Sequence, residues 1–76
     1  MIEQTVKDIL SEELKIEPIK ITSEFSQKDF VSWDSLKHIN IVISLEKKFK
    51  TEFEPEEISE MHSFSSIVKI VENKIK

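Results

Sequence analysis

The sequence of 76 residues contains no glycine, and this absence limits what the chain can fold into and bind. Glycine-rich phosphate loops and dinucleotide-binding fingerprints both need glycine, so these two modes of nucleotide binding are excluded. Helices commonly end on a glycine in the left-handed conformation. We therefore expect the helices of this chain to end at Asn, Lys or plain loops.

Cysteine and arginine are also absent, and the net charge is −4. Without cysteine the chain forms no disulfide, which is consistent with a reducing compartment. Without arginine it lacks bidentate clamps for phosphate or carboxylate groups. The negative charge disfavours a nucleic acid as partner, because neutralising phosphates requires a basic face.

The length of the chain predicts a single domain over residues 1–76. The N-terminal sequence MIEQTVKDIL lacks the basic and apolar regions of a signal peptide. No apolar run approaches the ~20 residues that span a bilayer. These features predict a soluble, cytoplasmic protein without membrane insertion.

Apolar residues recur at helical spacing in three segments, which predict three main helices. The first covers residues 1–14, with the apolar residues Ile2, Val6, Ile9, Leu10 and Leu14. In the second, Leu36 to Phe49, the apolar residues fill more than half of the helical wheel. We expect this helix to be the central one, in contact with several neighbours. The third begins after Ser63 and carries the stripe Phe64, Ile67, Val68, Val71 and Ile75.

The remaining segments predict one short helix and one long loop. Pro55 stands at a first helical position with Glu56 and Glu57 in the first turn, which favours a helix of one or two turns. Residues 15–34 show no sustained period, and their apolar side chains are expected to anchor the loop: Ile19, Ile21, Phe25, Phe30 and Trp33. The predicted fold is all-α: a small four-helix bundle with three main helices, one short third helix and a long loop between helices one and two.

Asp34 and Ser35 stand where this loop becomes the second helix. Asp34 is a natural N-cap, since its side chain accepts from a backbone N–H and its charge suits the positive helix end. Ser35 beside it is consistent with ordinary helix-start chemistry. A hydrolytic role is excluded because His38 is within reach but no glycine elbow or third orienting group accompanies it. The other histidine, His62, is expected on the surface or bonded within a loop, and no residue cluster has metal-ligand spacing.

The segment Asp34-Ser35-Leu36, followed by an apolar helix ending in Leu45-Glu46-Lys47-Lys48-Phe49, resembles the acyl carrier protein family. The resemblance continues through Phe53, the turn Pro55-Glu56-Glu57-Ile58, Met61 and the closing helix from Phe64, and covers nearly the whole chain. It implies that Ser35 is the attachment site of a 4'-phosphopantetheine arm. It also implies that Asp34 and Leu36 take part in recognition by the enzyme that attaches the arm.

By this resemblance the chain is expected to be a discrete carrier and not an enzyme. It would hold an acyl group as a thioester on the arm and present it to enzymes of fatty acid or polyketide biosynthesis. Its partners would be a phosphopantetheinyl transferase and acyl-activating and acyl-transferring enzymes, with the carrier acting as a monomer. Ile39, Ile58 and Met61 would line a cavity for the acyl chain, although Ile58 and Met61 are most simply core residues.

The second helix departs from the pattern of fatty acid synthase carriers, which usually present acids there. This helix has one acid, Glu46, against three lysines, Lys37, Lys47 and Lys48. Ser32 also replaces the glycine that is common two positions before the aspartate of the motif. These departures favour a dedicated carrier in a specialised pathway that uses the three lysines for partner recognition, or else the lysines form only a solvated face.

Two other functions are compatible with the same residues. The motif does not distinguish an acyl carrier from an aminoacyl or peptidyl carrier of a nonribosomal system. The chain could also be a helical interaction module whose serine is never modified. For Trp33 we favour an anchor that packs the loop on the bundle over a contact for a partner.

Overall fold

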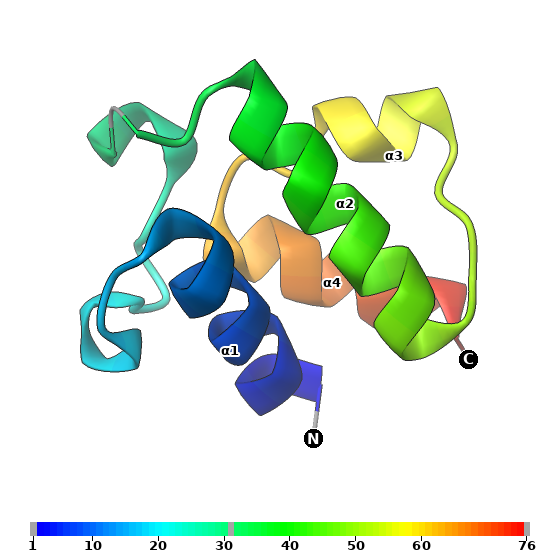
Figure 1. Ribbon diagram of the computed structural model, residues 1–76. Coiled ribbons are helices and arrows are strands. Elements are labelled where there is room, and N and C mark those ends of the chain that lie inside the picture. Colours follow the sequence, from blue (N-terminus) through cyan, green and yellow to red (C-terminus); the bar gives the residue numbers. More distant parts are fainter. Residues whose placement is uncertain (1, 31, 76) are drawn as a thin grey trace.

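In the part of the chain that the structure describes, the apolar periodicity of the sequence corresponds to four α-helices. The computed structural model describes residues 2–30 and 32–75. Its helices are α1 (Ile2–Leu14), α2 (Ser35–Phe49), α3 (Pro55–Ser59) and α4 (Phe64–Lys74), and the 3-10 turns η1 (Pro18–Lys20) and η2 (Gln27–Asp29) lie between α1 and α2. The predicted all-α fold with a short third helix and a long loop is confirmed (Figure 1). The expected helix start at Met1 lies outside the described residues.

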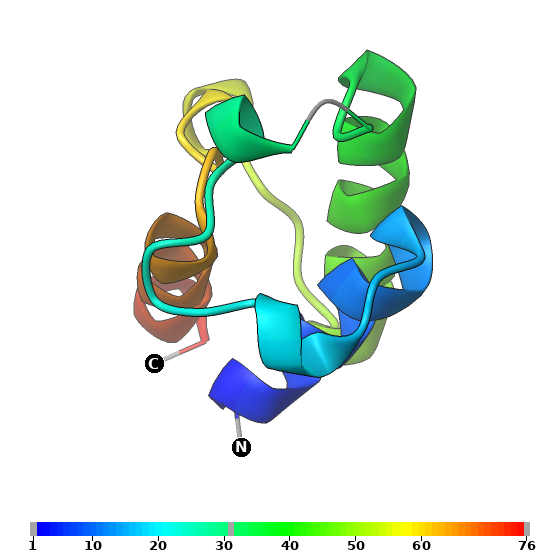
Figure 2. The same ribbon diagram turned by 90° about the vertical axis from the view of Figure 1, so that its left-hand side faces the viewer.

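Helix α1 packs against both α2 and α4, and one apolar core lies between these three helices. Figure 2 shows the long loop running from the end of α1 to the side of α4 and then to the start of α2. The core includes Val6, Leu10, Ile41, Leu45, Met61, Ile67 and Val71, all fully buried. Burying one such side chain contributes about 1.5–3 kcal/mol. Core packing therefore holds the helices together more than their intrinsic propensities do.

Two helices end at a lysine in the left-handed conformation, as the lack of glycine predicts. Lys15 follows α1 with φ 57°, and Lys50 follows α2 with φ 54°. The N–H of Lys50 donates to the carbonyl of Glu46, and the N–H of Thr51 reaches the same carbonyl at 3.2 Å. A residue with a Cβ is disfavoured in this conformation by roughly 1–2 kcal/mol. Both C-terminal caps therefore adopt a left-handed backbone conformation that glycine would adopt at a lower energetic cost.

The apolar anchors of the loop are confirmed with one exception. Ile21 and Trp33 are buried, and Phe25 and Phe30 pack partly buried against the core. Ile19, by contrast, is 81 % exposed, so its expected role as an anchor is wrong. It lies in the middle of η1, a 3-10 turn with no buried residue.

Hydrogen bonds tie the loop to the start of α4. The N–H of Gln27 donates to the carbonyl of His62 at 2.7 Å, and the N–H of Phe64 donates to the carbonyl of Phe25 at 2.9 Å. The hydroxyl of Ser65 donates to the carbonyl of Ser23 at 2.6 Å. Because these bonds join residues far apart in the sequence, they fix the path of the loop toward α2.

The apolar arc of α2 is only partly buried. Ile41, Val42 and Leu45 enter the core, whereas Leu36 is 67 %, Ile39 55 % and Ile43 44 % exposed. The expectation that this helix is the central one is wrong, because α1 is the helix that packs against both α2 and α4, and these three apolar residues of α2 are exposed. They recur at spacings of three and four, which places them along one outer face of the helix. We refer to Leu36, Ile39 and Ile43 as the apolar stripe of α2.

Candidate functional site

Asp34 caps α2, as its position in the sequence predicts. Its backbone is extended, and its Oδ1 accepts a hydrogen bond of 2.9 Å from the N–H of Lys37. Its carbonyl accepts the N–H of His38 at 2.9 Å, which begins the helical hydrogen bonding. The side chain thus satisfies an N–H that the helix start would leave without a partner. It also places a carboxylate at the positive end of the helix dipole.

Ser35 is the first residue of α2, and its side chain is exposed. Leu36, the next residue, begins the apolar stripe and is largely exposed too. The three residues of the motif therefore form a surface feature: a capping carboxylate, an accessible hydroxyl and an apolar side chain. The fold positions this hydroxyl through the cap and not through a pocket.

The ring of His38 is engaged on both sides by groups other than Ser35. Its Nδ1 accepts a hydrogen bond of 3.0 Å from Nε1 of Trp33, and its Nε2 lies 2.9 Å from the carbonyl oxygen of Ile58. Neither ring nitrogen is thus available to remove a proton from Ser35. The histidine that lies within reach of Ser35 in the sequence is therefore committed to other partners.

Trp33 is a loop anchor, as favoured from the sequence. Its side chain is only 2 % exposed, and its ring stacks on Phe25 with centroids 6.0 Å apart. The backbone of Trp33 is held as well, since its N–H donates to the carbonyl of Phe30 and its carbonyl accepts from Nε2 of Gln27. A residue buried to this extent cannot offer its ring to a partner, so the alternative role of Trp33 is wrong.

The interaction between Trp33, His38 and Ile58 was not predicted from the sequence. One signal was present, because a buried tryptophan requires an acceptor for its indole N–H. The position of the acceptor depends on how the loop, α2 and α3 meet in space, and no local pattern encodes that meeting.

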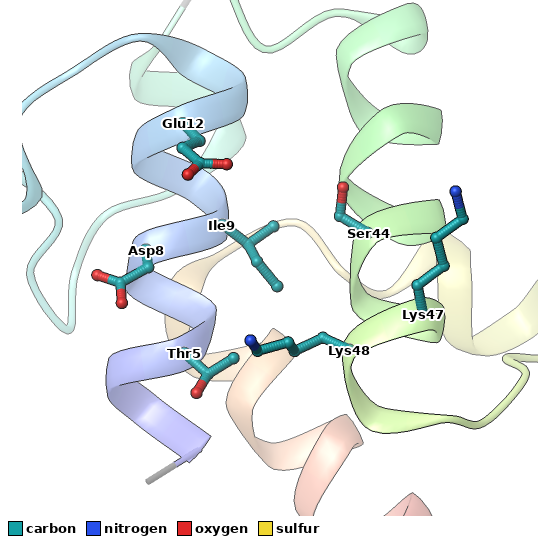
Figure 3. Close-up of a pocket in the computed structure, with 7 residues that line it drawn as sticks. All are labelled: Thr5, Asp8, Ile9, Glu12, Ser44, Lys47 and Lys48. Atoms are coloured by element: carbon teal, nitrogen blue, oxygen red, sulfur yellow. The ribbon is translucent and has the colours of Figure 1, made fainter.

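Two of the three lysines assigned to partner recognition line a groove between α1 and α2 of about 530 Å³. Lys47 and Lys48 are exposed there, opposite Asp8 and Glu12 of α1. In Figure 3 Lys48 extends across the groove toward α1, whereas Lys47 runs along the outer side of α2. Lys37 is half-buried near the start of α2.

The three residues expected to line an acyl cavity do not share one environment. Met61 is fully buried, Ile58 packs partly buried against the core, and Ile39 is 55 % exposed. Met61 and Ile58 therefore act as core residues in this conformation. A cavity formed by all three stays a prediction.

The described residues lack both a metal-binding cluster and a membrane-spanning helix. Residues 2–30 and 32–75 contain no group of three or more His, Cys, Asp or Glu placed to hold a metal ion. Within the same residues, every helix is too short or too polar to cross a membrane.

The fold and the site together define a class: a small helical domain that presents an accessible serine beside a capped helix start. Comparison with known proteins identifies the family more closely. No protein-family model matches the chain. The chain is 31% identical over 71 residues to an acyl carrier protein of Bdellovibrio bacteriovorus, covering 93% of this chain and 91% of that protein. It is also 27% identical over 72 residues to an acyl carrier protein of Thermosynechococcus vestitus, covering 95% of this chain and 89% of that protein.

The chain belongs to the acyl carrier protein family. It is accordingly a carrier and not an enzyme, in a family whose members are generally modified with 4'-phosphopantetheine and work with biosynthetic enzymes.

Proposed function

We propose that this carrier bears 4'-phosphopantetheine on Ser35 and holds an acyl group on it for the enzymes of a specialised pathway. The observation that carries the proposal is the exposed hydroxyl of Ser35 at the capped start of α2. When bound, the arm supplies a thiol, which the protein sequence lacks, and the acyl group is held there as a thioester. Tethering raises the effective concentration of this group at each enzyme that meets the carrier.

The residues around Ser35 fit a phosphodiester. The N–H groups of the first helical turn have no carbonyl partners within the helix, and with the helix dipole they favour a phosphate at this end. In the attachment step, Oγ of Ser35 gives its proton to a base of the transferase and bonds to the phosphorus of coenzyme A that carries the pantetheine. The bond from this phosphorus to the bridging oxygen breaks, and adenosine 3',5'-bisphosphate leaves.

The surface beside Ser35 supports docking of partner enzymes on α2. The apolar stripe of α2 begins at Leu36, and Lys47, four residues after Ile43, continues it, while Lys37 and Lys48 lie farther around the helix. A partner that fits this surface has an apolar seat with acidic residues at its edge. Lysines in place of acids favour a dedicated set of enzymes, which is why we propose a specialised pathway. We propose further that the carrier is a monomeric single domain and that it acts in the cytoplasm.

The intact mass of the protein tests this proposal. The protein is incubated with coenzyme A and a phosphopantetheinyl transferase of broad specificity, and its mass is measured. A gain of one phosphopantetheine group is the expected result. If the mass does not change under conditions in which a known carrier is modified, the chain is an unmodified interaction module and the proposal is wrong.

The nature of the load separates an acyl carrier from an aminoacyl or peptidyl carrier. The arm-bearing protein is offered to acyl-activating and aminoacyl-activating enzymes with their substrates, and thioester formation is followed by mass. We expect acyl groups to be accepted. Loading by aminoacyl-activating enzymes alone would assign the chain to a nonribosomal system instead.

A further inference from the structure

The partners of His38 determine which of its ring nitrogens carries the proton. The indole Nε1–H of Trp33 only donates, so Nδ1 of His38, 3.0 Å away, must accept and carries no proton. The carbonyl of Ile58 only accepts, so Nε2 of His38, 2.9 Å away, carries the proton and donates. The ring therefore makes two directed hydrogen bonds as one neutral tautomer, between a loop on one side and α3 on the other.

The bond to Trp33 acts close to Ser35 along the chain. Trp33 lies two residues before Ser35, and the intervening residue is the cap Asp34. The other hydrogen bonds and the stacking contact of Trp33 in the described residues, with Phe30, Gln27 and Phe25, come from the loop itself, while its buried side chain also belongs to the core. His38 thus adds a directed hydrogen bond between this loop and the helix whose first turn carries Ser35.

The bond to Ile58 acts at a distance from the modified serine. Ile58 lies in α3, 20 residues after His38 in the sequence. This bond joins the first turns of α2 to the short third helix, which few other polar contacts hold in the described residues. The two bonds of His38 thus have separable consequences, one for the entry into α2 and one for the seating of α3.

We infer that His38 is a positioning residue that holds the Trp33-Asp34 entry in the arrangement in which Ser35 is recognised for attachment of the arm. This inference rests on the proposed function of Ser35. A preformed entry lets the transferase bind without first ordering the loop, and such preorganisation favours binding. Loss of the bond to Trp33 should therefore raise KM for the carrier and leave kcat nearly unchanged.

Two amide substitutions separate the bonds of His38. In His38→Asn the side-chain oxygen can take the place of Nδ1 and still accept from Trp33, but the side chain is too short to reach Ile58. In His38→Gln the amide nitrogen can take the place of Nε2 and still donate to Ile58, but the acceptor for Trp33 is lost. Trp33→Phe removes the indole donor from the other side. His62→Gln, at an exposed histidine, is the matched control.

The test measures kcat and KM for arm attachment, with helicity checked by circular dichroism. His38→Asn and His62→Gln should stay within about twofold of the wild type, while His38→Gln and Trp33→Phe should raise KM about five- to tenfold, the size of one hydrogen bond. The double variant Trp33→Phe with His38→Gln should be no worse than either single variant, because both remove the same bond.

Three outcomes would overturn the inference. One is a wild-type KM for His38→Gln or, if that variant does not fold, for Trp33→Phe. Another is an equal loss in His38→Asn and His38→Gln, which would show a purely structural role for the ring. A third is a loss confined to kcat. If the wild-type protein itself gains no arm, the proposed function has failed, and this result is distinct from all three.

Discussion

Asp34 caps α2 and is predicted to take part in recognition of Ser35, and substitutions can separate these two roles. Its Oδ1 accepts the N–H of Lys37, and its charge stands one residue before the exposed hydroxyl of Ser35. Asp34→Asn keeps a capping oxygen and loses the charge, whose interaction with the helix dipole is worth about 0.3–1 kcal/mol. Asp34→Ala loses the cap as well and should cost about 0.5–2 kcal/mol.

We expect both variants of Asp34 to slow modification of Ser35, although Asp34→Asn should unfold at nearly the wild-type denaturant concentration. Chemical denaturation and the rate of arm attachment are measured on the same preparations. If attachment falls only in proportion to the loss of stability, Asp34 is a cap and has no role in recognition.

Lys50 occupies the left-handed C-cap of α2 with φ 54°. Glycine adopts this conformation without a Cβ clash, while its greater freedom in the unfolded chain offsets part of the gain. Lys50→Gly should therefore raise the free energy of unfolding by about 0.5–1 kcal/mol. Lys48→Gly, inside the last turn of the helix, is the matched control and should lower it by a similar amount. Destabilisation by both glycines would show that the conformation of Lys50 carries no penalty.

At the scale of the elements, Glu57 joins α3 to α4. The backbone N–H of Glu54, 2.7 Å from Oε1, and Nζ of Lys74, 3.0 Å from the same oxygen, hold the pKa of Glu57 below its ordinary value of 4.5. A lowered pKa means that the ionised carboxylate stabilises the folded state. This contribution is fully present above the unfolded pKa and is lost as the pH falls through the folded pKa.

Glu57→Gln should consequently be less stable than the wild type at neutral pH, and the difference should shrink as the solution is acidified. Thermal unfolding of both proteins between about pH 7 and about pH 3 measures this difference. A gap that stays constant over the whole range would mean that the charge of Glu57 does not stabilise the junction of α3 with α4.

The lysines of α2 are predicted to act together at this scale. Reversal of Lys37, Lys47 and Lys48 to Glu should weaken loading by the cognate enzyme, and more at low salt than at high salt, since ions screen the attraction. A control with the same change of net charge reverses the exposed Lys20, Lys28 and Lys69. Loading rates are compared across ionic strength. Equal behaviour of the two triple variants would show that the lysines of α2 form only a solvated face.

At the scale of the whole molecule, local signals predicted the elements well. Asp34, Pro55 and Ser63 mark helix starts through capping and fixed backbone geometry, and the structure places α2, α3 and α4 at these residues. Burial was less predictable, because periodicity tells which residues share a face but not whether a neighbour covers that face. The apolar stripe of α2 and Ile19 show this limit, since all are exposed.

In the candidate site, too, residues of one continuous segment were predictable, whereas a contact between distant segments was not. The cap and the serine belong to one continuous segment, so the sequence alone located them. The contact of His38 with Ile58 crosses 20 residues and depends on the packing of α2 against α3. Such a contact follows only from the assembled structure.

Localisation of the arm tests the central claim most directly. Ser35→Ala and Ser32→Ala remove hydroxyl groups from two exposed serines that lie three residues apart, on either side of the cap. Each variant is incubated with coenzyme A and the transferase, and the mass of the intact protein is measured. We predict that Ser32→Ala gains one phosphopantetheine group, as the wild type does, and that Ser35→Ala folds but gains none. An arm retained on Ser35→Ala would contradict the assignment of Ser35 as the site at which this carrier holds its load.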